Sequence, residues 1–475
     1  MQSEEDADDV ERAVGTLVRD VMARDGLPGV SVAVVDSGGQ RFAAGYGSRD
    51  LSRNEPATPR TLYCVGSCTK SVTALAVARL AEAGHLSLED PVSEHVPFEA
   101  ETGHPAPTLG HLLSHASGLP SLGVSEALIA RRTGSGEAGV PLGSRADFHA
   151  HLAGAGGEAV APPGERFAYC NAGYVLLGEV VERYADAPYA AHVESSILDP
   201  LGMTRSTFDG DVLEADGDAM TPYLLEGAGD DDEGSGTGEA AGGGPTAAPF
   251  PERPLTYPTG GLLAPVTEVG RYLRATLNGG ELDGTRVAEP ETVETLLAGR
   301  VETPTGRYGY GWRRRDVAGT TVVGHGGSVG VSSAYVGLCP ELDRGVALAC
   351  NASPSYGLAE LGAGVVALLA GAEPADLPFF ARRAAFDRFV GEYATYRDVQ
   401  RATVSRDGGT LRLAVHGVRG TTAVPLSPVG TGADGEFVAV GASGERSPVR
   451  FVAGAAGEEY DGRRLLYDRR VFHAR

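Results

Sequence analysis

The sequence predicts an α+β protein, an α/β sandwich in which helices flank an antiparallel sheet, followed by a small all-β domain. Three observations predict this. Residues 1–375 mix amphipathic helical patterns with alternating strand patterns, and the stretch at about 105–250 is mostly helical pattern broken by Gly and Pro. From about 385 to 475, short alternating segments are separated by turn residues. We therefore expect one sheet domain built from both halves of 1–375, a helical insertion at about 105–250, and a barrel-like domain at 385–475.

The first half of the chain opens with apolar residues at helical spacing over 8–26. GVSVAVVDS (29–37) and QRFAAGYG (40–47) alternate as strands and are joined by Gly-Gly. TKSVTALAVARLAEAG (69–84) has the spacing of an amphipathic helix that ends at Gly84. The acidic, Gly-rich stretch at about 228–249 predicts a flexible surface loop.

The second half of the chain first shows strand patterns and a helix, and then a series of short alternating segments. Short strands are predicted in RYGYGWRRR, TTVVGH, SSAYVGLC and GVALACN, between 306 and 351, and a helix follows near 357–371. The end domain is predicted to use five alternating segments: RATVSRD, GTLRLAV, GEFVAVG, SPVRFVAG and RRLLYDRRVF.

The charge balance excludes several kinds of partner. The 475 residues carry a formal net charge of −23 and a pI of about 4.9. Such a chain repels phosphate backbones and anionic lipid surfaces, so we expect neither nucleic acid nor membrane as a partner. Acidic surplus with near-absence of lysine is typical of proteins from halophilic organisms, and a GC-rich codon bias would have the same effect on lysine.

The termini and cysteines favour a cytoplasmic protein. MQSEEDADDV lacks the basic start and apolar stretch of a signal peptide, and the apolar run at 361–372 predicts a buried helix rather than a membrane span. The five cysteines are odd in number and fit no zinc pattern, so we expect reduced, mostly buried thiols. A disulfide between Cys68 and Cys170 is the alternative.

Ser67 and Lys70 are the leading candidates for chemistry. They lie three apart at the start of the predicted helix, which places them on one face, about 5–6 Å apart at Cβ. A serine hydroxyl becomes a nucleophile when a neighbouring base takes its proton. A lysine with a depressed pKa can be that base, whereas arginine stays protonated. Lys70 is the one lysine among 40 basic residues, which indicates that this position needs a side chain that can lose its proton, as arginine cannot.

Two further stretches hold candidate site residues. Tyr169 and Asn171 bracket Cys170 just before a helical pattern; a tyrosine beside an ammonium has a lowered pKa and can shuttle protons, and the amide can hold Lys70 and a substrate carbonyl. In VVGHGGSVG, His325 ends a strand, and the glycines at 326 and 327 admit a close backbone approach.

The N–H of Ser328 could pair with that of Ser67 as an oxyanion hole. Taken singly, Tyr-x-Asn and His325 are each better explained by structural roles.

Together, GSCTK, YCN and HGG resemble the serine β-lactamase and penicillin-binding-protein superfamily, and are most similar to the class C β-lactamase-like branch of peptidases and esterases. TLGHLLSHASGLP, DPLGMTRSTF and YGYGW support the resemblance, which covers about 10–370. It implies a β-lactamase/transpeptidase-like fold. The end domain resembles the lipocalin-like β-barrel attached to some hydrolases of this branch.

The resemblance implies a role for each candidate. Ser67 is the acylated nucleophile, and Lys70 accepts its proton or keeps Tyr169 ionised. Tyr169 protonates the leaving group and activates water for deacylation. Asn171 orients substrate and Lys70. His325, Gly326, Gly327 and Ser328 form the substrate-binding edge, with the Ser328 N–H at the oxyanion; His325 stands where many β-lactamases have a lysine, which leaves a weaker, pH-dependent positive charge.

The sequence therefore predicts a serine hydrolase that forms an acyl-enzyme on an amide or ester of a small molecule or short peptide. A peptidase or esterase is favoured, and a true β-lactamase or a catalytically silent ligand-binding protein are the alternatives. No cofactor or metal is expected, since HLLSH places His111 and His115 four apart but lacks the glutamate of a metalloprotease. The sequence leaves the oligomeric state open.

Overall fold

A computed structural model describes residues 4–98, 100–133, 142–225, 244–251, 254–407, 409–417, 420–430, 432–441, 443–453 and 462–475. The chain forms two compact units, Met1–Ala372 and Glu373–Arg475. Of the predicted acidic loop at 228–249, residues 228–243 lie outside the described residues. The remainder includes a short strand, β6 (Thr246–Ala247), paired with β5 (Tyr223–Leu224), where a flexible loop was predicted.

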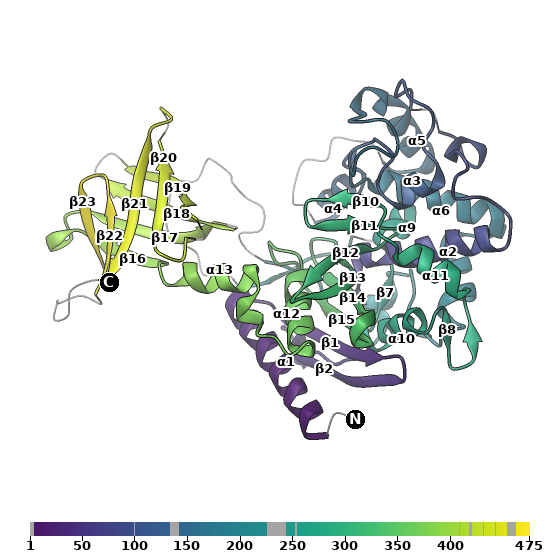
Figure 1. Ribbon diagram of the computed structural model, residues 1–475, viewed down its shortest axis with the longest axis horizontal. Helices are drawn as coiled ribbons and strands as arrows, with labels where there is room; N and C mark the ends of the chain where they lie inside the picture. The colour runs from purple at the N-terminus through teal and green to yellow at the C-terminus, as the bar shows by residue number, and fades with distance from the viewer. Residues whose placement is uncertain are drawn as a thin grey trace. The chain divides into compact units, whose positions relative to one another are not determined.

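The first unit is built on a nine-stranded antiparallel sheet (Figure 1). Its strand order is β10-β11-β12-β13-β14-β15-β1-β2-β3, so strands from the two ends of the unit meet where β15 pairs with β1. The bounds are β1 (Gly29–Asp36), β2 (Gly39–Asp50), β3 (Glu55–Pro56), β10 (Val301–Thr303), β11 (Gly306–Tyr308), β12 (Arg313–Val317), β13 (Thr320–Ser328), β14 (Ser333–Cys339) and β15 (Arg344–Cys350). The predicted α+β class and antiparallel sheet are confirmed.

Helices cover both faces of this sheet (Figure 1). The helix α10 (Val266–Leu277) packs on β1, β14 and β15, whereas α12 (Ala359–Leu369) packs on β14 and β15 and against α1 (Glu4–Asp25). All eight residues of β1 are buried, as a central strand between two helical layers requires. Gly362 of α12 lies where an added Cβ would meet the Tyr335 ring at 2.1 Å, so this helix packs close to the sheet.

The nucleophile region and a helical region complete the first unit. The helix α2 (Thr69–Glu82) is preceded by the strand β4 (Tyr63–Cys64) and the 3₁₀ turn η1 (Gly66–Cys68). The remaining helices of this unit are α3 (Leu109–Leu113), α4 (Val124–Thr133), α5 (Arg145–Ala153), α6 (Asn171–Ala185), α7 (Tyr189–Val193), α8 (Val212–Ala215), α9 (Tyr257–Gly260) and α11 (Pro290–Leu297). β4 pairs with β7 (Leu263–Ala264), and β8 (Glu281–Leu282) with β9 (Thr285–Arg286).

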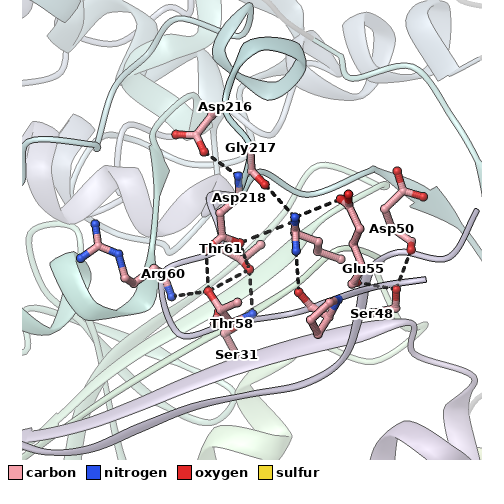
Figure 2. Close-up of polar contacts among 12 residues, drawn as sticks. Ser31, Ser48, Asp50, Glu55, Thr58, Arg60, Thr61, Asp216, Gly217 and Asp218 are labelled. Atoms are coloured by element: carbon pink, nitrogen blue, oxygen red, sulfur yellow. Dashed lines mark hydrogen bonds and ion pairs between the residues drawn. The ribbon is translucent and has the colours of Figure 1, made fainter. Parts of the chain in front are cut away.

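A polar network anchors the chain just before the nucleophile region (Figure 2). The Asp218 carboxylate accepts hydrogen bonds from the hydroxyls of Thr58 and Thr61, both at 2.6 Å. Arg49 lies 3.7 Å from the same carboxylate and 2.9 Å from that of Glu55. Because the Asp218 carbonyl also accepts the N–H of Leu62 at 2.8 Å, the segment leading into β4 is held on both sides.

The second unit is a closed barrel of eight antiparallel strands in sequence order. They are β16 (Gly391–Ala394), β17 (Arg401–Asp407), β18 (Thr410–Gly417), β19 (Gly420–Pro428), β20 (Glu436–Val440), β21 (Arg446–Ala453), β22 (Arg463–Tyr467) and β23 (Arg470–Ala474), preceded by α13 (Pro378–Asp387). β23 pairs with β16 and leaves no open edge. The barrel core includes Phe437, Leu465 and Phe472, each 0–1% exposed. The predicted all-β barrel is confirmed.

Three barrel features differ from the sequence prediction. The strands β16 and β19 were not among the five predicted segments. The last predicted segment, RRLLYDRRVF, is a hairpin rather than one strand. Asp468 and Arg469 both have positive φ, 45° and 64°, as a two-residue primed turn requires.

All five cysteines are free and buried. Among the residues that the structure describes, no helix has the length and apolar character needed to cross a bilayer.

Candidate active site

Ser67 and Lys70 are brought together as their spacing predicts. Ser67 lies in the 3₁₀ turn η1, and Lys70 lies in the first turn of α2. Lys70 Nζ is 3.0 Å from Ser67 Oγ and 2.7 Å from the carbonyl oxygen of Thr259. The backbone carbonyl fixes the amine beside the hydroxyl, which is the geometry a nucleophile and its base need.

Burial sets the protonation of Lys70. Its side chain is 0% exposed, and desolvation lowers the pKa of the amine from 10.5 to about 7. The nearby positive charge of Arg313 lowers the pKa further, whereas Glu126 opposes the shift. A neutral amine is therefore well populated at neutral pH, and it can accept a proton from Ser67.

Tyr169 lies over the same amine but is not ionised. Its ring centroid is 5.0 Å from Lys70 Nζ, and its hydroxyl hydrogen bonds to Ser67. Burial raises the pKa of Tyr169 above its usual value of 10; the bond to Ser67 and the charge of Arg313 only partly oppose this. The sequence-based expectation of a lowered pKa and an ionised tyrosine is wrong, because desolvation of this half-buried side chain outweighs the neighbouring cation. A phenol at this position is able to donate a proton.

Asn171 faces the site without the contact to Lys70 that was expected. It is the first residue of α6 and is 6% exposed, and within the described residues its Oδ1 has no hydrogen-bond partner. The backbone carbonyl of Thr259, rather than the side-chain amide of Asn171, accepts the hydrogen bond from the Lys70 amine. A buried, unpaired acceptor is costly, so Asn171 is placed to receive a donor from a bound molecule.

His325 ends up as a neutral, buried residue of β13. It is 3% exposed, its Nε2 is 2.9 Å from the Tyr308 hydroxyl, and its Nδ1 is 2.6 Å from the Gly326 carbonyl. Burial, with Lys70 and Arg313 adding to it, holds the pKa of His325 well below 6.5. The predicted pH-dependent positive charge at this position is therefore wrong for neutral pH.

The end of β13 packs directly on the nucleophile turn. A Cβ added to Gly327 would lie 2.0 Å from the Val65 carbonyl oxygen and 2.8 Å from Ser67 N, so only glycine fits. A Cβ added to Gly66, which has a φ of +52°, would lie 2.6 Å from Ser328 N. The main-chain nitrogens of Ser67 and Ser328 thus border the same place. Gly326 has no such constraint, because its nearest neighbour would be 3.7 Å away.

Two cavities lie at the site, and Ser67 lines the first of them. The first, the Glu126 cavity, measures about 230 Å³ and is lined by Ser67, Asn171, Thr259 and Glu126, among others. The second, the Arg313 cavity, measures about 410 Å³ and is lined by Arg313 to Arg315, His325 and Gly327, among others. Tyr169 and Ser328 line both cavities. The site can therefore hold a molecule that extends to both sides of the nucleophile.

His115 is a site residue that sequence reasoning missed. The sequence predicted a packed helix at HLLSH. In the structure, His115 lies after the end of α3, has a φ of 56° and is 1% exposed. Its Nδ1 accepts the N–H of Cys170 at 3.1 Å, and its carbonyl accepts the N–H of Ala168 at 2.8 Å. Its ring lies 4.0 Å from the ring of Tyr169, centroid to centroid.

His115 thus binds the main-chain N–H groups of the two residues on either side of Tyr169. Burial holds the pKa of His115 well below 6.5, with the charges of Lys70, His325 and Arg313 adding to the effect. Because Nδ1 accepts a hydrogen bond, the neutral ring carries its proton on Nε2. Among the described residues, Nε2 has no hydrogen-bond partner, and no group of three or more potential metal ligands is present.

The family model described as "Beta-lactamase" matches residues 14–371. The chain belongs to this family. A second family model, "Pab87 octamerisation domain", matches residues 374–473.

Relatives agree with this assignment. The "octameric penicillin-binding protein homologue from Pyrococcus abyssi" has 31% identity and a TM-score of 0.84, over 97% of this chain and 99% of the other. "Protein flp" of Staphylococcus aureus is 30% identical over 223 residues, 46% of this chain and 42% of its own length. "Unguisins hydrolase ungD" of Aspergillus violaceofuscus is 25% identical over 354 residues, 69% of this chain and 59% of its own length. The chain therefore spans less than two thirds of either curated relative, and hydrolases are among the relatives of the family.

Proposed function

We propose that the protein is a serine hydrolase that cleaves an amide or ester bond of a small molecule or short peptide through an acyl-enzyme on Ser67. The observation that carries this proposal is the 3.0 Å contact between Ser67 Oγ and an amine with a pKa of about 7. Burying the Lys70 amine destabilises the fold, so a purely structural role does not explain why the amine is placed beside a hydroxyl. The membership in a family with hydrolases supports the same conclusion.

The proposed reaction follows from the protonation states. Neutral Lys70 takes the Ser67 proton as Oγ bonds to the substrate carbonyl carbon, and the N–H groups of Ser67 and Ser328 receive the developing oxyanion. Tyr169, a phenol in the free enzyme, gives its proton to the leaving group as the bond to the carbonyl breaks. The proton on Lys70 then restores the phenol. Water cleaves the ester in the second step and frees Ser67, with Tyr169 and Lys70 handling its proton.

Peptidase or esterase activity fits this site better than true β-lactamase activity. The position that carries a lysine in many β-lactamases holds His325, which is neutral at neutral pH. Turnover of a chromogenic cephalosporin, a short acyl ester and an aminoacyl anilide, each at low and high salt, separates these activities. We expect the ester or anilide to be the better substrate. If only the cephalosporin is hydrolysed, the protein is a β-lactamase; if none is hydrolysed and none leaves an adduct on Ser67, it is a silent binding protein.

We also propose that the second unit mediates self-assembly. Its match to an octamerisation domain and the octameric homologue support this. Two of its large hydrophobic side chains, Tyr396 and Val399, are 69% and 84% exposed and are available for a contact between copies. Light scattering of the full chain should give a mass well above the 49.0 kDa of one copy. A monomer at micromolar concentration would reject this part of the proposal.

A further inference from the structure

Two charged side chains, for which the described residues supply no ionic partner, line the two cavities at the site. They are Glu126, in the first turn of α4, and Arg313, at the start of β12. In a protein with a net charge of −23, an acidic residue near an arginine is easy to supply, so a guanidinium left unpaired beside an active site is informative. The two side chains line different cavities, and those cavities meet at Tyr169 and Ser328.

Glu126 is the one charged side chain that lines the Glu126 cavity within the described residues. It is exposed, and its carboxylate accepts one hydrogen bond, from the Ser121 hydroxyl at 3.1 Å. Within the described part of the chain, no arginine, lysine or histidine pairs with it. Its charge nevertheless reaches the site, since it raises the pKa of both Lys70 and Tyr169. The carboxylate is therefore placed to accept an ammonium group of a molecule that contacts Ser67.

Arg313 is held by aromatic rings rather than by an acid. Its guanidinium carbon lies 5.5 to 5.8 Å from the ring centroids of Phe167, Tyr169 and Tyr308. Rings at this distance favour the cation and restrict its motion, but they leave its N–H groups without a carboxylate. The one acidic residue that lines the Arg313 cavity, Glu360, is engaged by Arg315 at 3.4 Å.

The chemistry at Ser67 decides which part of a substrate lies in which cavity. Ser67 and Asn171 line the Glu126 cavity, so the acyl part that becomes bonded to Ser67 lies there. The leaving group receives the proton of Tyr169 and departs on the side of the Arg313 cavity. The Glu126 cavity, at about 230 Å³, falls below the about 300–1,000 Å³ typical of ligand pockets, so the acyl part is small.

We propose that the substrate is a short peptide with both termini free, whose α-ammonium group binds Glu126 and whose α-carboxylate binds Arg313. The inference rests on the proposed acyl-enzyme mechanism. Ser67 Oγ bonds to the carbonyl carbon of the first residue, the C–N bond breaks, and the released amine takes its proton from Tyr169. Water then releases the first residue as a free amino acid. The protein acts on dipeptides and tripeptides as an aminopeptidase.

The test compares four forms of one dipeptide, prepared in both stereochemical series: free, N-acetylated, C-amidated, and capped at both ends. Product release is followed by mass spectrometry. Because a hydrogen bond to a charged group is worth about 1.5–3 kcal/mol, each cap should lower kcat/KM by about ten- to hundredfold. Equal rates for all four forms would overturn the proposal. Preference for the N-acetylated form would show that Glu126 does not bind the α-ammonium group.

Two variants assign the charges to their termini. Glu126→Gln should lower the ratio of kcat/KM for the free peptide to kcat/KM for the N-acetylated peptide about ten- to hundredfold. The ratio is the readout because the loss of this charge also changes the pKa of Lys70, which affects both peptides alike. Arg313→Gln should lower the ratio of kcat/KM for the free carboxylate to kcat/KM for the amide by a similar factor. Arg307→Gln is the matched control, because Arg307 lines the same cavity but pairs with Glu302 at 3.1 Å. A loss in Glu126→Gln that is equal for free and N-acetylated peptides would contradict the assignment.

Failure of this inference can be told apart from failure of the proposed function. All variants and the wild type are also treated with a small neutral activated ester, which carries neither charge. Acylation of Ser67 by the ester in the wild type, Glu126→Gln and Arg313→Gln shows that the nucleophile works without the charged groups, although the acylation rates shift with the pKa of Lys70. If the ester acylates Ser67 but the caps have no effect, only the peptide assignment is wrong. If the wild type is not acylated at all, both the peptide assignment and the hydrolase proposal are wrong.

Discussion

Replacing Lys70 by arginine separates the role of a proton acceptor from that of a positive charge. With a pKa of about 7, about half of the Lys70 amines are neutral at pH 7. Arginine, with a pKa of about 12.5, is neutral in about three molecules per million at that pH. The arginine variant therefore keeps the cation and loses the base almost completely.

The expected loss is large because a general base usually contributes about 10²- to 10⁴-fold. Lys70→Arg should lower the rate of Ser67 acylation by at least about 10²-fold, close to the loss in Lys70→Ala. Stopped-flow measurement with an activated ester reports this step. In the wild type the rate should rise with pH through about 7, because the deprotonated amine is the active form. An arginine variant within tenfold of the wild type, or a rate that falls as pH rises through 7, would refute the reasoning.

Three further predictions concern the groups around this pair. Lys70→Met should stabilise the fold at and below pH 7 by up to about 5 kcal/mol, because the pKa falls from 10.5 to about 7 at about 1.36 kcal/mol per unit. The unfolded chain binds the extra proton between these pH values, so the gain in unfolding free energy should vanish as pH approaches 10.5; a pH-independent difference in denaturant titrations would contradict it. Gly327→Ala should lower kcat about 10²- to 10³-fold by displacing the oxyanion donors, whereas Gly326→Ala has room for its methyl group; equal activity of the two variants would count against this geometry. His115→Phe should lower kcat more than KM and shift the pH profile, while His115→Asn, which keeps an acceptor and tolerates a positive φ, should retain more activity; identical losses would show that the bond to Cys170 N–H is unimportant.

The sequence predicted the parts of the site that depend on local spacing. Ser67 and Lys70 share a helical face whenever that helix forms, and the apolar periodicity of 69–84 is sufficient to predict it. Gly327 was identified as a place where a substrate backbone approaches closely, and the structure shows that the backbone beside it is the chain's own, at Val65 O and Ser67 N.

The missed features depend on contacts between distant segments. The partner of Lys70 is the backbone carbonyl of Thr259, and every residue has such a carbonyl, so no side-chain pattern marks it. His115 contacts a tyrosine more than fifty residues away, and its pattern also fits a packed helix. The pKa of Tyr169 was assigned the wrong direction because its degree of burial, which outweighs the cation, is set by tertiary packing.

The most direct test of the central claim is the intact mass of the protein after brief exposure to an activated ester. Wild type should gain the mass of one acyl group per chain, and peptide mapping should place it on Ser67. Ser67→Ala should gain none, and Lys70→Arg should acquire it far more slowly than the wild type. An adduct on another residue, or equal adduct formation in Ser67→Ala, would contradict the assignment of Ser67 as the nucleophile.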